Sequence, residues 1–125
     1  MSALTSALLV ALGGAFGALL RSGADALTAR LGIAAPIGTL VVNAGGSFAA
    51  GLVVTLIADR LLPDAARPLV VVGLLGGFTT FSAFALQLAR MGEGGELLAL
   101  IAYAVGSILL GLLAASAGVA LARAL

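Results

Sequence analysis

The polar side chains that could do chemistry in this sequence are neutral hydrogen-bond donors set within long apolar runs. They are Asn43, Ser47, Thr79, Thr80, Ser82, Tyr103 and Ser107. No Asp or Glu lies within residues 1–24, 31–58, 68–89 or 97–122. Neutral donors suit an anion better than a cation, and proton-coupled transporters need a carboxylate inside the membrane. Proton coupling therefore has no obvious carrier in this chain.

Asn43 stands close to the middle of the second apolar run. An amide facing lipid at that depth would be costly, so the side chain must face protein or a water-filled path. Its NH₂ group could donate to a passing anion, or it could form a hydrogen bond between helices. The residue by itself leaves both interpretations open.

The stretch Gly76-Gly77-Phe78-Thr79-Thr80-Phe81-Ser82-Ala83-Phe84 lies in the third apolar run. Its glycines, β-branched residues and hydroxyls disfavour a continuous helix, which predicts a local break. Carbonyls freed at such a break are good ligands for a hard cation such as Na⁺. Phe81 and Phe84 share a helical face, and the positive edges of their rings can meet an anion, although core packing is the commoner role of Phe.

The composition indicates an all-α integral membrane protein. The 125 residues are 62% hydrophobic and 9% charged, and the mean hydropathy is +1.29. Four uncharged runs each reach the roughly 20 residues that a spanning helix needs. We therefore predict one four-helix transmembrane domain over residues 1–125, with the third helix broken and the helices at roughly 3–29, 36–58, 68–90 and 97–123.

Several classes of function are disfavoured by the same composition. Six scattered arginines and no lysine form no basic patch for nucleic acid. The absence of His and Cys removes the usual transition-metal ligands. No nucleophile and base pair is apparent, so we predict that the chain is not an enzyme.

The arginines are balanced across the predicted membrane. Arg60, Arg67 and Arg123 fall on one side, and Arg21, Arg30 and Arg90 fall on the other. The positive-inside rule then has little to act on. We predict dual topology, with each chain pairing with an inverted copy of itself as an antiparallel homodimer in the lipid bilayer.

Three motifs in order resemble the small fluoride channel family, often called Fluc or CrcB, over nearly the full length. The first is GGAFGALLR at 13–21, and the second is GTLVVN at 38–43 followed by GSF at 46–48 and Gly51. The third, GLLGGFTTFSAF at 73–84, is similar to the family's Gly-Gly-x-Thr-Thr-Phe-Ser-x-Phe stretch almost position for position. The chain is identified on these motifs as a member of that family.

The resemblance implies roles for residues around the predicted break and for Asn43 on the second helix. Phe81 and Phe84 match the paired phenylalanines beside the fluoride positions, and Asn43 matches the pore-facing asparagine. Ser82 and Thr80 match adjacent hydroxyl positions.

The resemblance also implies a structural cation and a second polar row. The backbone carbonyls of Gly76 and Thr79, from both subunits, would hold a central Na⁺. Tyr103 and Ser107 belong to a polar track on the fourth helix, and position 111, where the family often has a hydroxyl, is glycine here. Water or a neighbour could supply that polar step, or this face matters less in this protein.

Arg21 matches the first-helix arginine, for which attraction of anions to a vestibule and bracing of the fold both remain open. The function implied is passive export of fluoride across a prokaryotic plasma membrane, which lowers cytoplasmic fluoride and gives fluoride resistance. Two alternatives are a small ion-coupled exporter of the multidrug type and a non-transporting membrane scaffold.

Overall fold

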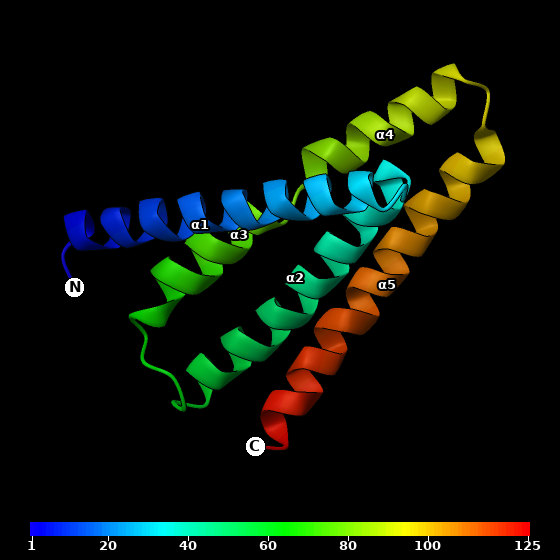
Figure 1. Cartoon of the computed structure of the whole chain (residues 1–125). Helices are drawn as coiled ribbons and strands as arrows, with labels where there is room; N and C mark the ends of the chain where they lie inside the picture. The colour runs from blue at the N-terminus through cyan, green and yellow to red at the C-terminus, as the bar shows by residue number, and fades with distance from the viewer.

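The computed structural model describes all 125 residues, and every regular element in it is helical. The elements in order are α1 (Ala3–Arg30), α2 (Ala35–Ala58), the π-helical segment η1 (Arg67–Leu75), α3 (Gly76–Phe78), α4 (Phe81–Glu93) and α5 (Leu97–Arg123). Figure 1 shows them as an up-and-down arrangement in which α2 and α5 run side by side.

Four helical stretches are long and apolar enough to cross a membrane, as the sequence predicted. They are α1, α2, α5 and the composite stretch Arg67–Glu93 made of η1, α3 and α4. In Figure 1 the two chain ends and the α2–η1 connection lie toward one end of the molecule, and the other connections lie toward the opposite end. Successive spans therefore cross in opposite directions.

The isolated chain buries little of itself. Only 11 of the 125 residues are buried, while large apolar side chains on every span are exposed. A soluble protein does not leave such a surface in water. Lipid or another protein chain must cover it.

Glycine lets the helix backbones touch where α1 packs along η1 and α3, and where α2 packs along α5. A Cβ atom added at Gly73 would lie 2.8 Å from the carbonyl oxygen of Val10 in α1. Gly51 of α2 lies against the backbone of Ala115 in α5 in the same way. Small residues of this kind allow close helix association in membranes.

The third span is broken at Thr79 and Thr80, inside the stretch where the sequence predicted a break. Both residues have extended backbones, with φ −82° and ψ 154° at Thr79 and φ −146° and ψ 116° at Thr80. The helix restarts at Phe81 and continues as α4. Two segments of one span thus meet at a non-helical dipeptide, which is the feature that organises the candidate site.

Candidate functional site

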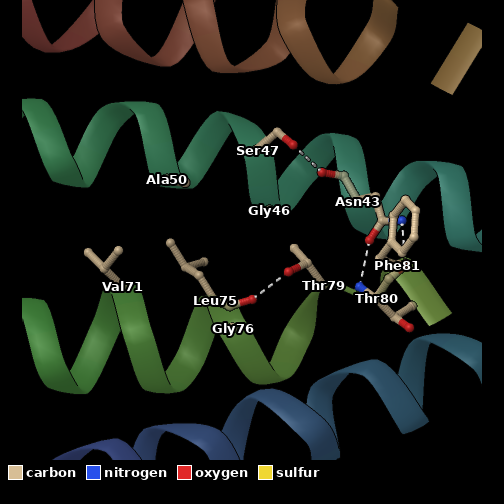
Figure 2. A pocket seen from close by; sticks show the side chains of 10 residues that line it. All are labelled: Asn43, Gly46, Ser47, Ala50, Val71, Leu75, Gly76, Thr79, Thr80 and Phe81. Carbon is tan, nitrogen blue, oxygen red and sulfur yellow. Dashed lines mark hydrogen bonds between the residues drawn. The ribbon is translucent and has the colours of Figure 1, made fainter. Parts of the chain in front are cut away.

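An open pocket of about 390 Å³ lies beside the break, between α2 and the third span. Figure 2 shows its lining, which consists of Asn43, Gly46, Ser47, Ala50, Val71, Leu75, Gly76, Thr79, Thr80 and Phe81. Six of the residues that the sequence singled out, from α2 and the third span, are therefore brought to one place: Asn43, Ser47, Gly76, Thr79, Thr80 and Phe81.

Asn43 holds the break open through two hydrogen bonds to the backbone of Thr80. Its Oδ1 accepts from the Thr80 amide at 2.8 Å, and its Nδ2 donates to the Thr80 carbonyl at 2.9 Å. The side chain thus makes the bond between helices that the sequence left open. An amide nitrogen carries two hydrogens, so one N–H remains for another acceptor.

Hydrogen bonds to side chains at the break leave two backbone carbonyls without their regular helical donors. In a continuous helix the Thr80 amide would donate to the Gly76 carbonyl, and the Ala83 amide to the Thr79 carbonyl. Instead the Thr80 amide donates to Asn43, and the Ala83 amide donates to Thr80 Oγ1 at 3.2 Å. The carbonyls of Gly76 and Thr79 thereby lack their regular helical donors, and both residues line the pocket.

Helix α4 begins in the interior of the span with a side-chain cap. Thr80 Oγ1 supplies that cap, and it lies 3.3 Å from the hydroxyl of Ser82. The N-terminus of a helix carries partial positive charge and unpaired amide groups. The predicted hydroxyl positions therefore lie where the backbone itself favours an anion.

An aromatic row leads from the break to α5. The ring centroids of Phe81 and Phe84 are 5.7 Å apart, and those of Phe84 and Tyr103 are 5.2 Å apart. Phe84 and Tyr103 meet edge to face, whereas Phe81 is 78% exposed at the rim of the pocket. Phe81 and Phe84 lie on α4 and Tyr103 lies on α5. The three rings thus form one continuous row.

Sequence reasoning missed two residues that extend this row. The Tyr103 hydroxyl donates to Gln87 Oε1 at 2.6 Å, and Gln87 Nε2 donates to the hydroxyl of Thr39 at 2.8 Å. A signal was present, because Gln87 is the only glutamine in the chain and follows Phe84 by three positions. That spacing puts both on one helical face.

Arg21 lies near the same break but on the other side of the third span. Its Nε donates to the carbonyl of Gly77 at 3.2 Å, which braces α1 against the residues just before the break. It also lines a second cavity of about 190 Å³, with Thr39, Thr80 and Gln87 among the neighbours. The bracing contact is thus present in the structure, and the attraction of anions to a vestibule stays a prediction.

Ser107 lies one turn beyond Tyr103 on α5. Its Oγ is buried and has no hydrogen-bond partner within the chain. A buried hydroxyl without a partner is costly, particularly in a membrane. The Ser107 hydroxyl is therefore a polar group that the single chain leaves unsatisfied.

Backbone carbonyl oxygens are the groups that could bind a metal ion at this site. No group of three or more His, Cys, Asp or Glu side chains comes together in the structure. Neutral oxygen ligands suit hard cations. The released carbonyls of Gly76 and Thr79 thus fit the Na⁺ that the resemblance implies, and do not fit a transition metal.

Comparison with known proteins places the chain in a family. Residues 8–119 match the family described as CrcB-like protein, Camphor Resistance (CrcB). The chain is 46% identical over 116 residues to a protein of Paracoccus denitrificans, with 93% of each chain covered. It is 48% identical over 119 residues to a protein of Thermus thermophilus, covering 94% of this chain and 95% of that protein.

A third relative, from Rhizobium leguminosarum bv. trifolii, is 49% identical over 121 residues, covering 95% of this chain and 97% of the relative. All three relatives carry the name fluoride-specific ion channel FluC, which describes a channel and not an enzyme. The family match reaches into all four membrane-crossing stretches and includes the whole of the broken third one. The chain is therefore a multi-pass membrane protein that belongs to the CrcB family.

Proposed function

We propose that this protein is a fluoride-selective channel that lets fluoride leave the cell passively across the plasma membrane. The observation that carries the proposal is a set of neutral donors that converges on the helix break, with no Asp or Glu in residues 31–58, 68–89 or 97–122. The relatives named as fluoride-specific channels support the same function.

Fluoride is strongly hydrated, so its passage requires replacement of the water that it sheds. The spare amide hydrogen of Asn43, the hydroxyls of Thr80 and Ser82, and the edges of Phe81 and Phe84 offer that replacement. Tyr103 and Ser107 continue the path along α5. Each donor is neutral, which keeps any one site from holding the anion too tightly, and the closeness of the donors disfavours chloride.

Passive movement needs no coupled ion. In acidic surroundings fluoride enters as the neutral acid and dissociates in the cytoplasm, and the membrane potential then drives the anion out. An ion-coupled exporter would need a carboxylate embedded in the membrane. The only carboxylates in the spans lie toward helix ends, Asp25 in the last two turns of α1 and Glu93 at the end of α4. A non-transporting scaffold would not need hydrogen-bond donors gathered at the helix break, so it leaves them unexplained.

The working unit that we propose is an antiparallel homodimer. The pocket beside the break is open on the surface of the single chain, and Phe81 at its rim is mostly exposed. Polar groups and a broken backbone are tolerated at this depth only inside protein or beside water. A second, inverted copy would cover them, and the three-to-three arginine balance permits both orientations.

A structural Na⁺ is the remaining part of the proposal. The carbonyls of Gly76 and Thr79 would hold it, because both are released from helical hydrogen bonds and both residues line the open pocket. When bound, the ion would supply fixed positive charge between the two copies. Asn43 and Thr80 contribute by keeping those carbonyls free.

The direct test is fluoride efflux from liposomes that contain the purified protein, with K⁺ and valinomycin to clamp the voltage and a fluoride electrode as the readout. Rapid release of fluoride but not of chloride is the expected result. Folded, inserted protein that releases no fluoride would defeat the channel proposal, and a scaffold role would then be favoured. Flux that appears only with a Na⁺ or H⁺ gradient would favour the coupled exporter.

A further inference from the structure

The polar row on α5 has a gap. Tyr103, Ser107 and Gly111 recur every four residues, so successive members lie on one face about 6 Å apart along the helix. The first two carry hydroxyls, and the third has no side chain. A path along this face would lose its donor one turn after Ser107.

The hydroxyl of Ser47, on the facing helix α2, lies at the gap. A Cβ atom added at Gly111 would lie 3.7 Å from Ser47 Oγ, and that oxygen is the only heavy atom it would meet within 4 Å. In Figure 2 the Ser47 side chain lies on the upper side of α2, away from Val71 and Leu75 of the third span. Ser47 therefore occupies the space that a side chain at position 111 would otherwise reach.

The Ser47 hydroxyl can serve a ligand without leaving its rotamer. Its hydrogen donates to the carbonyl of Asn43 at 2.7 Å. That carbonyl lies inside α2, where the amide four residues later is its regular helical donor. Rotation of the hydroxyl hydrogen alone, which costs no side-chain movement, would turn the donor toward another acceptor.

Ser107 provides a second observation on this row. Its Oγ is buried and unpartnered, although a buried polar group ordinarily has a partner. Along the row, a hydroxyl without a partner is thus followed by one whose hydrogen can be redirected, so both could donate to an anion that reaches them.

We propose that Ser47 supplies, from α2, the hydrogen-bond donor that the α5 row lacks at Gly111, and so acts as a conduction residue for fluoride. The inference rests on the proposed channel function. It explains why a glycine at position 111 does not end the path, because the two helices share one hydroxyl at that level. It also adds a contribution of α2 to the path beyond Asn43.

The test is fluoride efflux from liposomes with four proteins: the wild type, Ser47→Ala, the double variant Ser47→Ala with Gly111→Ser, and Thr55→Ala. Thr55 is the matched control, because its hydroxyl makes the same bond to the carbonyl four residues earlier, Gly51, at 2.8 Å. We expect Ser47→Ala to slow fluoride efflux about tenfold, as loss of one hydrogen bond in a membrane protein permits. Thr55→Ala should conduct like the wild type.

Rescue by the double variant is the decisive outcome, because Gly111→Ser returns a hydroxyl to the row from the other helix. Recovery to near the wild-type rate supports the proposal, since a bond local to α2 could not be restored from α5. Wild-type flux in Ser47→Ala, or a defect that Gly111→Ser does not repair, would overturn it. Absence of flux in the wild type would be a separate result and would defeat the channel function itself.

Discussion

Asn43 and Thr80 exchange two hydrogen bonds, side chain to backbone, between two different spans. The pair does for the third span what a neighbouring strand does in a sheet, since it satisfies both backbone groups of a residue in extended conformation. The break is therefore a stable structure and not a frayed helix. It also sets the position of every donor that follows it on α4.

We predict that Asn43→Ala destabilises the protein and slows fluoride efflux. The alanine variant leaves the Thr80 amide unpaired at a cost of about 1–3 kcal/mol, because it lacks the oxygen that accepts from that amide. It also lacks the amide donor, so it should conduct fluoride poorly. Thermal unfolding in detergent and liposome flux measure the two effects, and a wild-type unfolding midpoint would contradict the bonding scheme.

Replacement of Phe81 by isoleucine should abolish most conduction and leave the fold intact. The ring is 78% exposed in the single chain and supports little of its packing, but isoleucine has no positive ring edge to offer an anion. We expect fluoride efflux to fall at least about tenfold, a change equivalent to about 1.4 kcal/mol in a barrier. Unchanged efflux in Phe81→Ile would argue that the aromatic row lies off the path.

Tyr103→Phe tests the hydrogen-bonded chain from Thr39 through Gln87 to α5. The phenyl ring at position 103 stays in place against Phe84. Gln87 Oε1 loses the Tyr103 hydroxyl, which donates to it at 2.6 Å in the wild type. A stability loss of about 1 kcal/mol is expected, together with slower fluoride efflux. The variant Gln87→Leu should resemble it if the three side chains act together, and additive losses in the double variant would contradict that coupling.

Two substitutions separate the two roles of Arg21. Arg21→Lys keeps the charge but not the planar Nε donor, which bonds the Gly77 carbonyl, so stability should fall by about 1.5 kcal/mol. Arg21→Gln should show the same loss and, in addition, slower fluoride entry at low ionic strength. That extra defect should vanish in high salt because salt screens the charge. A salt-independent defect would indicate that Arg21 acts by bracing alone.

Close packing of α1 on the third span predicts a sharp contrast between neighbouring glycines. Gly17→Ala would drive a methyl group into the backbone of Leu74 and Phe78. It should destabilise the protein by about 2 kcal/mol or more, within the range of other overpacked sites. Gly14→Ala meets nothing closer than 3.9 Å and should be neutral or slightly stabilising. Unfolding midpoints of the two variants provide the measurement.

The number of spans and the break could be predicted because each follows from local residue types. Charge-free runs define the four helices, and Gly76-Gly77 followed by Thr79-Thr80 weakens the third helix within one turn. The partner of Asn43 could not be predicted in this way. The sequence shows that a mid-membrane amide needs a partner, but which backbone group it meets depends on how α2 and the third span are aligned.

The same limit explains why Thr39 and Gln87 were missed. Gln87 is the only glutamine in the chain, but residue type alone does not show which groups it meets. The role of both residues arises only when α2, α4 and α5 bring three side chains together. The π-helical form of η1 also could not be predicted from the sequence, because hydrogen bonds between residues five apart follow no simple pattern of residue types. Contacts between helices, rather than propensities within them, decide these features.

The link between Asn43 and Thr80 also bears on the order in which the chain is made. Thirty-seven residues separate them, so at about 5–20 residues per second the ribosome completes Asn43 roughly two to seven seconds before Thr80. The second span can therefore be in the bilayer when the third arrives. When the third span enters the membrane, Asn43 on α2 is already in place to bond the Thr80 backbone. The break can therefore form against a helix that was made earlier.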